Sequence, residues 1–171
     1  MRVFLIGFMC SGKSHVGREL ARASGAEHID IDRVIERRIG PITPWFQQHG
    51  EAAFRAVEAE VLQELLGRSN VVVSTGGGTP CEGDNLERMR AVGTVVFLDV
   101  PFDVLLDRIA RKGGDRPMLF GLKGEALRER VEHLLSTRLP FYTRADMRVR
   151  AEEDPATIAA RIQQALEHQE R

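Results

Sequence analysis

Near its N-terminus the chain reads Gly7-Phe8-Met9-Cys10-Ser11-Gly12-Lys13-Ser14, which has the spacing G-x-x-x-x-G-K-[ST]. A short apolar run, Val3–Ile6, precedes it and is typical of a buried strand. An amphipathic stretch, Val16–Ala23, follows it and ends at Gly25, as a helix would. Strand, loop and helix in this order direct backbone N–H groups and a helix N-terminus at an anion. This turn is therefore predicted to bind phosphate groups.

Each position of the loop has an expected task. Lys13 would reach the β- and γ-phosphate oxygens of a nucleotide, and the hydroxyl of Ser14 would bind Mg²⁺. The alternative is a chance match in a tight strand-to-helix turn, which the flanking strand and helix make less favourable. The remaining expected nucleotide contacts from this segment are Cys10, Ser11, Gly12 and His15.

Composition describes an ordinary globular chain of one domain spanning residues 1–171. Hydrophobic residues make up 43%, charged residues 29%, and the net charge is −1. This charge balance provides no global basic field for nucleic acid or an anionic membrane. Met1-Arg2 leads straight into the first strand, and no apolar run approaches the ~20 residues of a membrane span. We expect a cytoplasmic protein in which the two cysteines, Cys10 and Cys81, are reduced.

The hydrophobic pattern alternates between strands and helices. This alternation predicts a parallel sheet between two helical layers, an α/β/α architecture. Thr43-Pro44 is interpreted as an N-cap followed by proline at the first helical position. The other expected strands are 27–31, 71–75, 94–100 and 147–149, and the other expected helices are 33–39, 43–66 with a break at Gly50, 84–92, 102–112 and 155–168.

The connection Gly113–Gly121 stands apart because it carries three glycines and a proline between two helices. A connection of this length without periodicity is usually a functional lid or a disordered loop. It contains Arg116, and an arginine on a glycine-flanked segment can close over a γ-phosphate and balance developing charge. The interpretation is a mobile lid over about residues 112–123.

Two acids, Asp30 and Asp32, end the expected second strand. Residues two apart on an extended chain project to the same side, so both carboxylates would face the phosphate-binding loop. One could hold Mg²⁺, and the other could bind a substrate hydroxyl and take its proton. The alternative is that Asp32 is the N-cap of the following helix.

Three further elements are ambiguous on their own. Gly76-Gly77-Gly78 could form a tight turn, but three glycines favour a wall of N–H groups lying against a substrate or phosphate. Arg55 could form a surface helical pair with Glu58, which is the simpler interpretation of an isolated arginine. Arg138 near the end of a helix could simply be favoured by the helix dipole.

Taken together, these elements resemble the shikimate kinase family along nearly the whole chain. The phosphate-binding loop alone is shared by very many nucleotide-binding proteins, but the others in this order are far more specific. The matching stretches are Gly7–Ser14, Asp30-Ile31-Asp32, Gly50-Glu51-x-x-Phe54-Arg55-x-x-Glu58, Ser74-Thr75-Gly76-Gly77-Gly78, Arg116-Pro117-Met118-Leu119 and Arg138-x-Pro140-x-Tyr142.

The resemblance implies a P-loop kinase fold with a five-stranded parallel sheet. It also implies transfer of the ATP γ-phosphoryl group to the 3-hydroxyl of shikimate, with Mg²⁺, by a monomer acting in aromatic amino acid biosynthesis. By the same resemblance, Asp30 assists the metal with Ser14, Asp32 binds the shikimate hydroxyls and is the candidate base, and Lys13 and Arg116 act in catalysis. The implied substrate contacts are Asp32, Arg55, Gly76, Gly77, Gly78 and Arg138; Arg111 and Pro155 resemble positions that flank adenine.

The chain departs from the family pattern at a few positions. Cys10 stands where the family most often has glycine, and Met118 replaces a leucine. Glu152 and Glu153 lie where some relatives carry arginine. A gluconate kinase or a nucleoside monophosphate kinase of the same fold is the alternative enzyme. A GTPase-like switch is disfavoured, because Asn70 and Asn85 do not supply an N-K-x-D segment.

Overall fold

A single parallel sheet organises the molecule. The computed structural model describes residues 1–112 and 116–169. Its sheet has the strand order β2-β3-β1-β4-β5, and every neighbouring pair is parallel. The predicted five-stranded parallel sheet is confirmed. The strands are β1 (Arg2–Ile6), β2 (Glu27–Asp30), β3 (Val71–Ser74), β4 (Thr94–Asp99) and β5 (Met147–Arg150).

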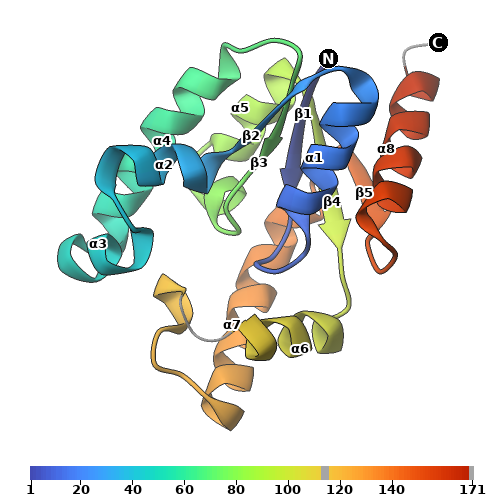
Figure 1. Cartoon of the computed structure of the whole chain (residues 1–171). Coiled ribbons are helices and arrows are strands. Elements are labelled where there is room, and N and C mark those ends of the chain that lie inside the picture. Colours follow the sequence, from blue (N-terminus) through green and yellow to red (C-terminus); the bar gives the residue numbers. More distant parts are fainter. Residues whose placement is uncertain (113–115, 170–171) are drawn as a thin grey trace.

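Helices cover both faces of this sheet. On one face, α1 (Lys13–Ser24) packs beside α8 (Pro155–Gln169), as Figure 1 shows. On the other, α4 (Glu51–Leu66) packs against α5 (Asn85–Val92). Crossovers between parallel strands are nearly always right-handed. A chain that moves from β1 outward to β2 and then back across the sheet therefore places its connecting helices on both faces. Helices therefore cover the central strands on both faces, which explains why Val71-Val72-Val73 is continuously apolar and fully buried.

The remaining helices surround the edge of the sheet where the strands end. They are α2 (Ile31–Ile39), α3 (Ile42–His49), α6 (Phe102–Lys112), α7 (Gly124–Tyr142) and the short 3₁₀ turns η1 (Thr79–Cys81) and η2 (Pro117–Leu119). Across residues 1–112 and 116–169, no helix has both the length and the apolar character required to cross a bilayer.

The predicted N-cap at Thr43 is wrong by two residues. Helix α3 begins at Ile42, and the carbonyl of Pro41 accepts the Trp45 amide at 3.4 Å. Pro41 therefore occupies the capping position, and Pro44 lies in the first turn. A proline is tolerated there because first-turn amides have no partner within the helix.

The expected lid falls partly outside the described residues, which exclude 113–115. From Arg116 onward the chain forms η2, whose Leu119 is buried, and η2 contacts α3. Leu119 therefore anchors this part of the connection, and the lid itself stays a prediction. The η2 turn lies opposite α3 at the carboxyl edge of the sheet.

Candidate active site

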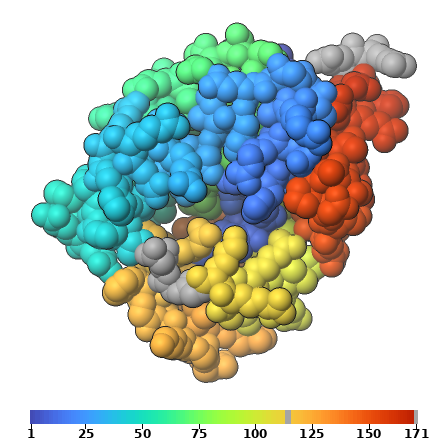
Figure 2. Space-filling model, viewed as in Figure 1, coloured from blue at the N-terminus to red at the C-terminus, as the bar shows by residue number. Residues whose placement is uncertain are grey.

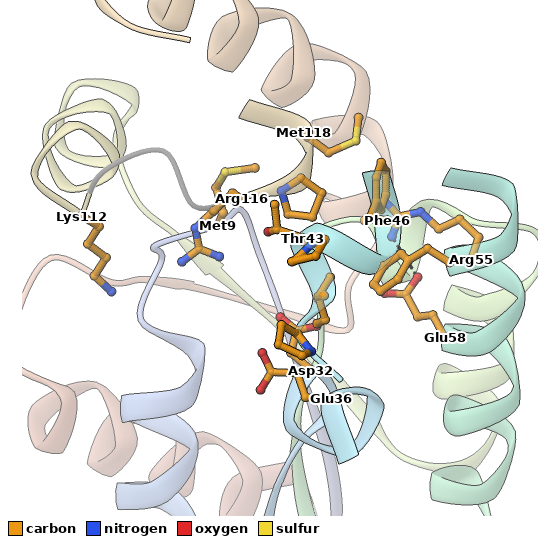
Figure 3. A pocket seen from close by; sticks show the side chains of 18 of the residues that line it. Met9, Asp32, Glu36, Thr43, Phe46, Arg55, Glu58, Lys112, Arg116 and Met118 are labelled. Carbon is orange, nitrogen blue, oxygen red and sulfur yellow. Dashed lines mark hydrogen bonds and ion pairs between the residues drawn. The ribbon is translucent and has the colours of Figure 1, made fainter. Parts of the chain in front are cut away.

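A cavity of about 440 Å³ opens at the carboxyl ends of the strands, beside the phosphate-binding loop. Figure 2 shows the hollow between the α2–α3 region and the segment that follows Arg116. Figure 3 shows the side chains that converge on it from several elements. Its lining includes the predicted substrate contacts Asp32, Arg55, Gly76, Gly77, Gly78 and Arg138, together with Arg116.

The phosphate-binding loop depends on glycine at two positions. Gly12, the N-cap of α1, has φ 93°, a left-handed conformation that side chains disfavour. Gly7 has φ 149°, and a Cβ there would lie 2.9 Å from the carbonyl oxygen of Leu98. Both ends of the loop therefore require a residue without a side chain, and the loop turns tightly onto α1.

Lys13 lies across this loop. Its ammonium donates to the carbonyls of Gly7 and Phe8, each at 2.8 Å, and the residue is buried. Burial lowers the pKa of Lys13 to about 8, and the nearby Asp32 carboxylate opposes that shift. The ammonium thus lies against two loop carbonyls, within electrostatic reach of the Asp32 carboxylate.

Cys10 connects the loop to the expected lid. Its φ of 61° is unusual for a residue with a side chain and suits the glycine that the resemblance implies at this position. The guanidinium of Arg116 donates from Nη2 to the Cys10 Sγ at 3.5 Å. Arg116 therefore lies over the phosphate-binding loop, on the side of the cavity (Figure 3).

Ser14 and Asp30 meet on the β2 side of the loop. The Ser14 hydroxyl donates to Oδ2 of Asp30, and Oδ1 of the same carboxylate accepts the Asp32 amide at 3.0 Å. Asp30 is therefore the N-cap of α2, the role that the alternative interpretation assigned to Asp32. A hydroxyl and a carboxylate together form an all-oxygen donor set, which suits Mg²⁺.

The expectation that Asp30 and Asp32 project to the same side of a strand is wrong. Strand β2 ends at Asp30, and Asp32 lies in the first turn of α2. The change from strand to helix at Ile31 separates the two carboxylates, so Asp30 faces Ser14 while Asp32 faces the cavity. Burial, with repulsion from Asp30 and Glu58, raises the pKa of Asp32 to about 6.

Arg55 belongs to a buried ion pair. Glu58 is 1% exposed, and its carboxylate accepts from Arg55 Nη1 at 2.9 Å and from the Thr79 hydroxyl at 2.8 Å. The simple interpretation of a solvent-exposed helical pair is therefore wrong. Sequence reasoning paired Glu58 with Arg55 but missed Thr79, because nothing local indicates that η1 approaches α4.

The three glycines make room for these charged groups. None of Gly76, Gly77 and Gly78 has positive φ, so a special turn conformation does not explain them. A Cβ at Gly78 would lie 2.4 Å from Arg55 Nη2, and one at Gly77 would lie 3.0 Å from Arg138 Nη1. The carbonyl of Gly77 also accepts the Tyr142 hydroxyl at 2.5 Å. The glycines thus let two guanidinium groups lie directly against the backbone.

Arg138 reaches the cavity from α7. It is 7% exposed, and its guanidinium lies 5.6 Å from the centre of the Phe8 ring. It lies four positions before Tyr142, the last residue of α7. An arginine favoured only by the helix dipole would be exposed at the surface. The burial of Arg138 therefore argues against that interpretation. Arg55 and Arg138 therefore converge on the same cavity from different helices.

A second cavity, of about 270 Å³, lies on the other side of the loop. It is lined by the predicted nucleotide contacts Cys10, Ser11, Gly12, His15 and Pro155. Arg111 does not line it, because its exposed side chain pairs with Asp107 at 3.2 Å. Arg108 takes that place and donates to the Cys10 carbonyl at 3.1 Å. Sequence reasoning missed Arg108, although it lies one helical turn before Arg111.

Known proteins resemble the chain over nearly its full length. The family profile described as "Shikimate kinase" matches residues 9–167. A shikimate kinase of Halorhodospira halophila is 46% identical over 171 residues, covering 98% of this chain and 94% of the relative. A solved shikimate kinase of Acinetobacter baumannii, in complex with shikimate, superimposes with a TM-score of 0.90 at 34% identity, covering 98% of this chain and 93% of the other.

A more distant likeness extends to another kinase. The structure of a gluconokinase from Sinorhizobium meliloti superimposes with a TM-score of 0.63 at 19% identity, covering 99% of this chain and 97% of the other. This likeness shows a shared fold only. It agrees with the P-loop kinase architecture expected from the N-terminal loop.

Proposed function

Because the chain belongs to the shikimate kinase family, we propose that it transfers the γ-phosphoryl group of ATP to the 3-hydroxyl of shikimate. The observation that carries this proposal is the arrangement of the larger cavity. Two guanidinium groups, of Arg55 and Arg138, lie in the same cavity as the Asp32 carboxylate and beside the phosphate-binding loop. A small hydroxy acid fits such a site. Its carboxylate needs cationic N–H donors, and its hydroxyl needs a hydrogen-bond acceptor.

The acceptor carboxylate would bind to Arg55 and Arg138. Planar guanidinium groups hold carboxylates through paired N–H···O bonds, and the surrounding glycines let both cations approach closely. Asp32 would then accept a hydrogen bond from the acceptor hydroxyl. Since its pKa is about 6, Asp32 is ionised at neutral pH and can take the hydroxyl proton as the phosphoryl group transfers.

The nucleotide would extend from the loop into the second cavity. The loop amides and Lys13 would hold the phosphates, and the smaller cavity beside Pro155 and Arg108 would hold the base and sugar. Arg116, which already contacts Cys10, would balance charge on the transferring group. Closing of the expected lid over residues 112–123 would exclude water.

Mg²⁺ fits the oxygen atoms of Ser14 and Asp30. Among residues 1–112 and 116–169 no three His, Cys, Asp or Glu side chains gather as a metal site, so the protein would supply one or two ligands and the phosphates the rest. When bound, Mg²⁺ neutralises phosphate charge during transfer. We further propose that residues 1–171 act as one catalytic domain, as a cytoplasmic monomer without a nucleic acid or membrane partner.

A coupled ADP-release assay tests the proposal. Shikimate, gluconate and nucleoside monophosphates would be offered with ATP and Mg²⁺, and the product would be identified by ³¹P NMR. We expect turnover with shikimate alone and a product phosphorylated at the 3-hydroxyl. Faster turnover of gluconate or of a nucleotide would overturn the assignment.

A further inference from the structure

A histidine and a serine connect the sheet to the first residue of α1, behind the phosphate-binding loop. The ring nitrogen Nε2 of His28 lies 2.9 Å from Oγ of Ser74, and this hydroxyl donates to the carbonyl of Lys13 at 2.9 Å. Ser74 is 1% exposed. We propose that His28 is a positioning residue for the nucleotide, acting through Ser74 on the backbone of Lys13; this rests on the proposed function.

The hydrogen-bond directions follow from counting protons. A serine hydroxyl has one proton, and Ser74 donates it to the Lys13 carbonyl. The Ser74 oxygen must therefore accept from His28, so Nε2 of the imidazole carries a proton. Both the Nε2–H tautomer and the imidazolium donate at this atom, so the direction holds in either charge state.

Close packing couples this pair to α1. A Cβ at Gly17 would lie 2.6 Å from His28 Nε2 and 2.6 Å from Ser74 Oγ. Helix α1 therefore lies directly on the imidazole and the hydroxyl, with no space for a bridging water at that point. The Nε2 edge of the imidazole is therefore packed against α1, whereas the rest of the ring borders the cavity that Ser14 and Asp30 also line.

The consequences should fall on the nucleotide and spare the acceptor. Lys13 and Ser14, which would hold the phosphates and Mg²⁺, both belong to the turn that Ser74 anchors. Arg55 and Arg138, which would hold the acceptor carboxylate, come from α4 and α7. His28 does not line the acceptor cavity. An effect confined to ATP therefore distinguishes positioning from general loss of structure.

Variants of His28 test this inference. His28→Leu removes the donor, whereas His28→Gln retains an N–H at the same distance along the side chain. We expect His28→Leu to raise the KM for ATP and the Kd for ADP with Mg²⁺ about fivefold, the effect of one lost hydrogen bond. The KM for shikimate should not change, and His28→Gln should recover most of the loss. His133→Leu, at an exposed position of α7, is the matched control.

A second measurement needs no activity. Long-range ¹H–¹⁵N spectra should show a proton on Nε2 of His28 in the native protein, as the donation to Ser74 requires. A proton on Nδ1 alone, an unchanged ADP affinity in His28→Leu, an equal loss for both substrates, or no recovery in His28→Gln would each overturn the inference. A native enzyme that binds ADP normally and shows this tautomer but does not phosphorylate shikimate would instead overturn the proposed function.

Discussion

Arg55 donates from Nη1 to Oε1 of Glu58 across 2.9 Å, and the accepting carboxylate is almost completely buried. The other carboxylate oxygen accepts from Thr79, so Glu58 is held from two elements. The ion pair therefore orients Arg55 toward the cavity, where Figure 3 draws Arg55 and Glu58 together among the lining residues. Glu58 also lines the cavity itself and repels the Asp32 carboxylate, so it acts on the acceptor site both through Arg55 and through Asp32.

Lysine substitutions at the two cavity arginines test the carboxylate contact. Arg55→Lys and Arg138→Lys keep the charge and remove the planar fork, so each should raise the KM for shikimate about tenfold or more. The KM for ATP should stay near its native value. Arg144→Lys, which changes an exposed arginine paired with Glu87, is the control. Steady-state kinetics in which only the ATP constant moved would contradict the assignment.

Gly78 should not tolerate a methyl group. Gly78→Ala would place Cβ 2.4 Å from Arg55 Nη2, so the guanidinium must move away from its position in the cavity. We expect a rise in the KM for shikimate comparable to that of Arg55→Lys. Gly67→Ala is the control, because its Cβ would meet only the Glu64 carbonyl at 3.6 Å. Equal kinetics for the two variants would show that Arg55 can shift without cost.

Replacing Asp32 should abolish most turnover while nucleotide binding persists. Asp32→Asn keeps the size of the side chain but cannot take a proton from the acceptor hydroxyl. We expect kcat to fall about 100-fold or more, within the range of general base catalysis. Asp103→Asn, at an exposed position of α6, provides the comparison. Calorimetry should detect ADP binding to both variants, and near-native turnover in Asp32→Asn would rule out the role.

The same residue should make stability depend on pH. The pKa of Asp32 is raised from 3.8 to about 6, so the folded state binds its proton more tightly than the unfolded state. Its favourable contribution is therefore complete below pH 3.8 and is lost as pH rises through about 6. Asp32→Asn should thus stabilise the ligand-free protein by about 2 kcal/mol at pH 8 and much less at pH 4. Urea unfolding at both pH values measures the difference, and equal stabilisation would exclude it.

Cys81 should be an unreactive thiol. Burial raises its pKa to about 11, although Arg138 and Arg55 oppose the shift. At pH 8 only about one molecule in a thousand would carry the reactive thiolate. In a Cys10→Ser variant, iodoacetamide should therefore modify Cys81 far more slowly in the folded protein than in urea. Mass spectrometry measures both rates, and equal rates would contradict a raised pKa of Cys81 in the folded protein.

Much of this site follows from short stretches of sequence. The loop Gly7–Ser14 could be recognised because its glycines and lysine act within one continuous turn. The sequence correctly places Asp30 and Asp32 at the carboxyl edge of the sheet. The expectation that their side chains point to the same side is wrong. Helix α2 begins at Ile31, two residues earlier than expected, which separates the two carboxylates, and local preference does not set that boundary.

Residues that position the site side chains through hydrogen bonds could not be found from short stretches of sequence. Thr79 approaches Glu58, Arg108 approaches Cys10, and His28 approaches Ser74 only after helices and strands pack. Arg111 does lie in helix α6, as expected. Its side chain pairs with Asp107 and does not line the second cavity.

The order of residues along the chain thus determined the parallel sheet, the phosphate-binding turn and the classes of side chain available to a substrate. Backbone preferences and hydrophobic periodicity act over a few residues, so they can be read without the fold. Tertiary structure alone decided that Arg55 and Arg138 share one cavity and that Asp32 faces it. These side chains come from separate helices, and only packing against the three glycines brings their charges together.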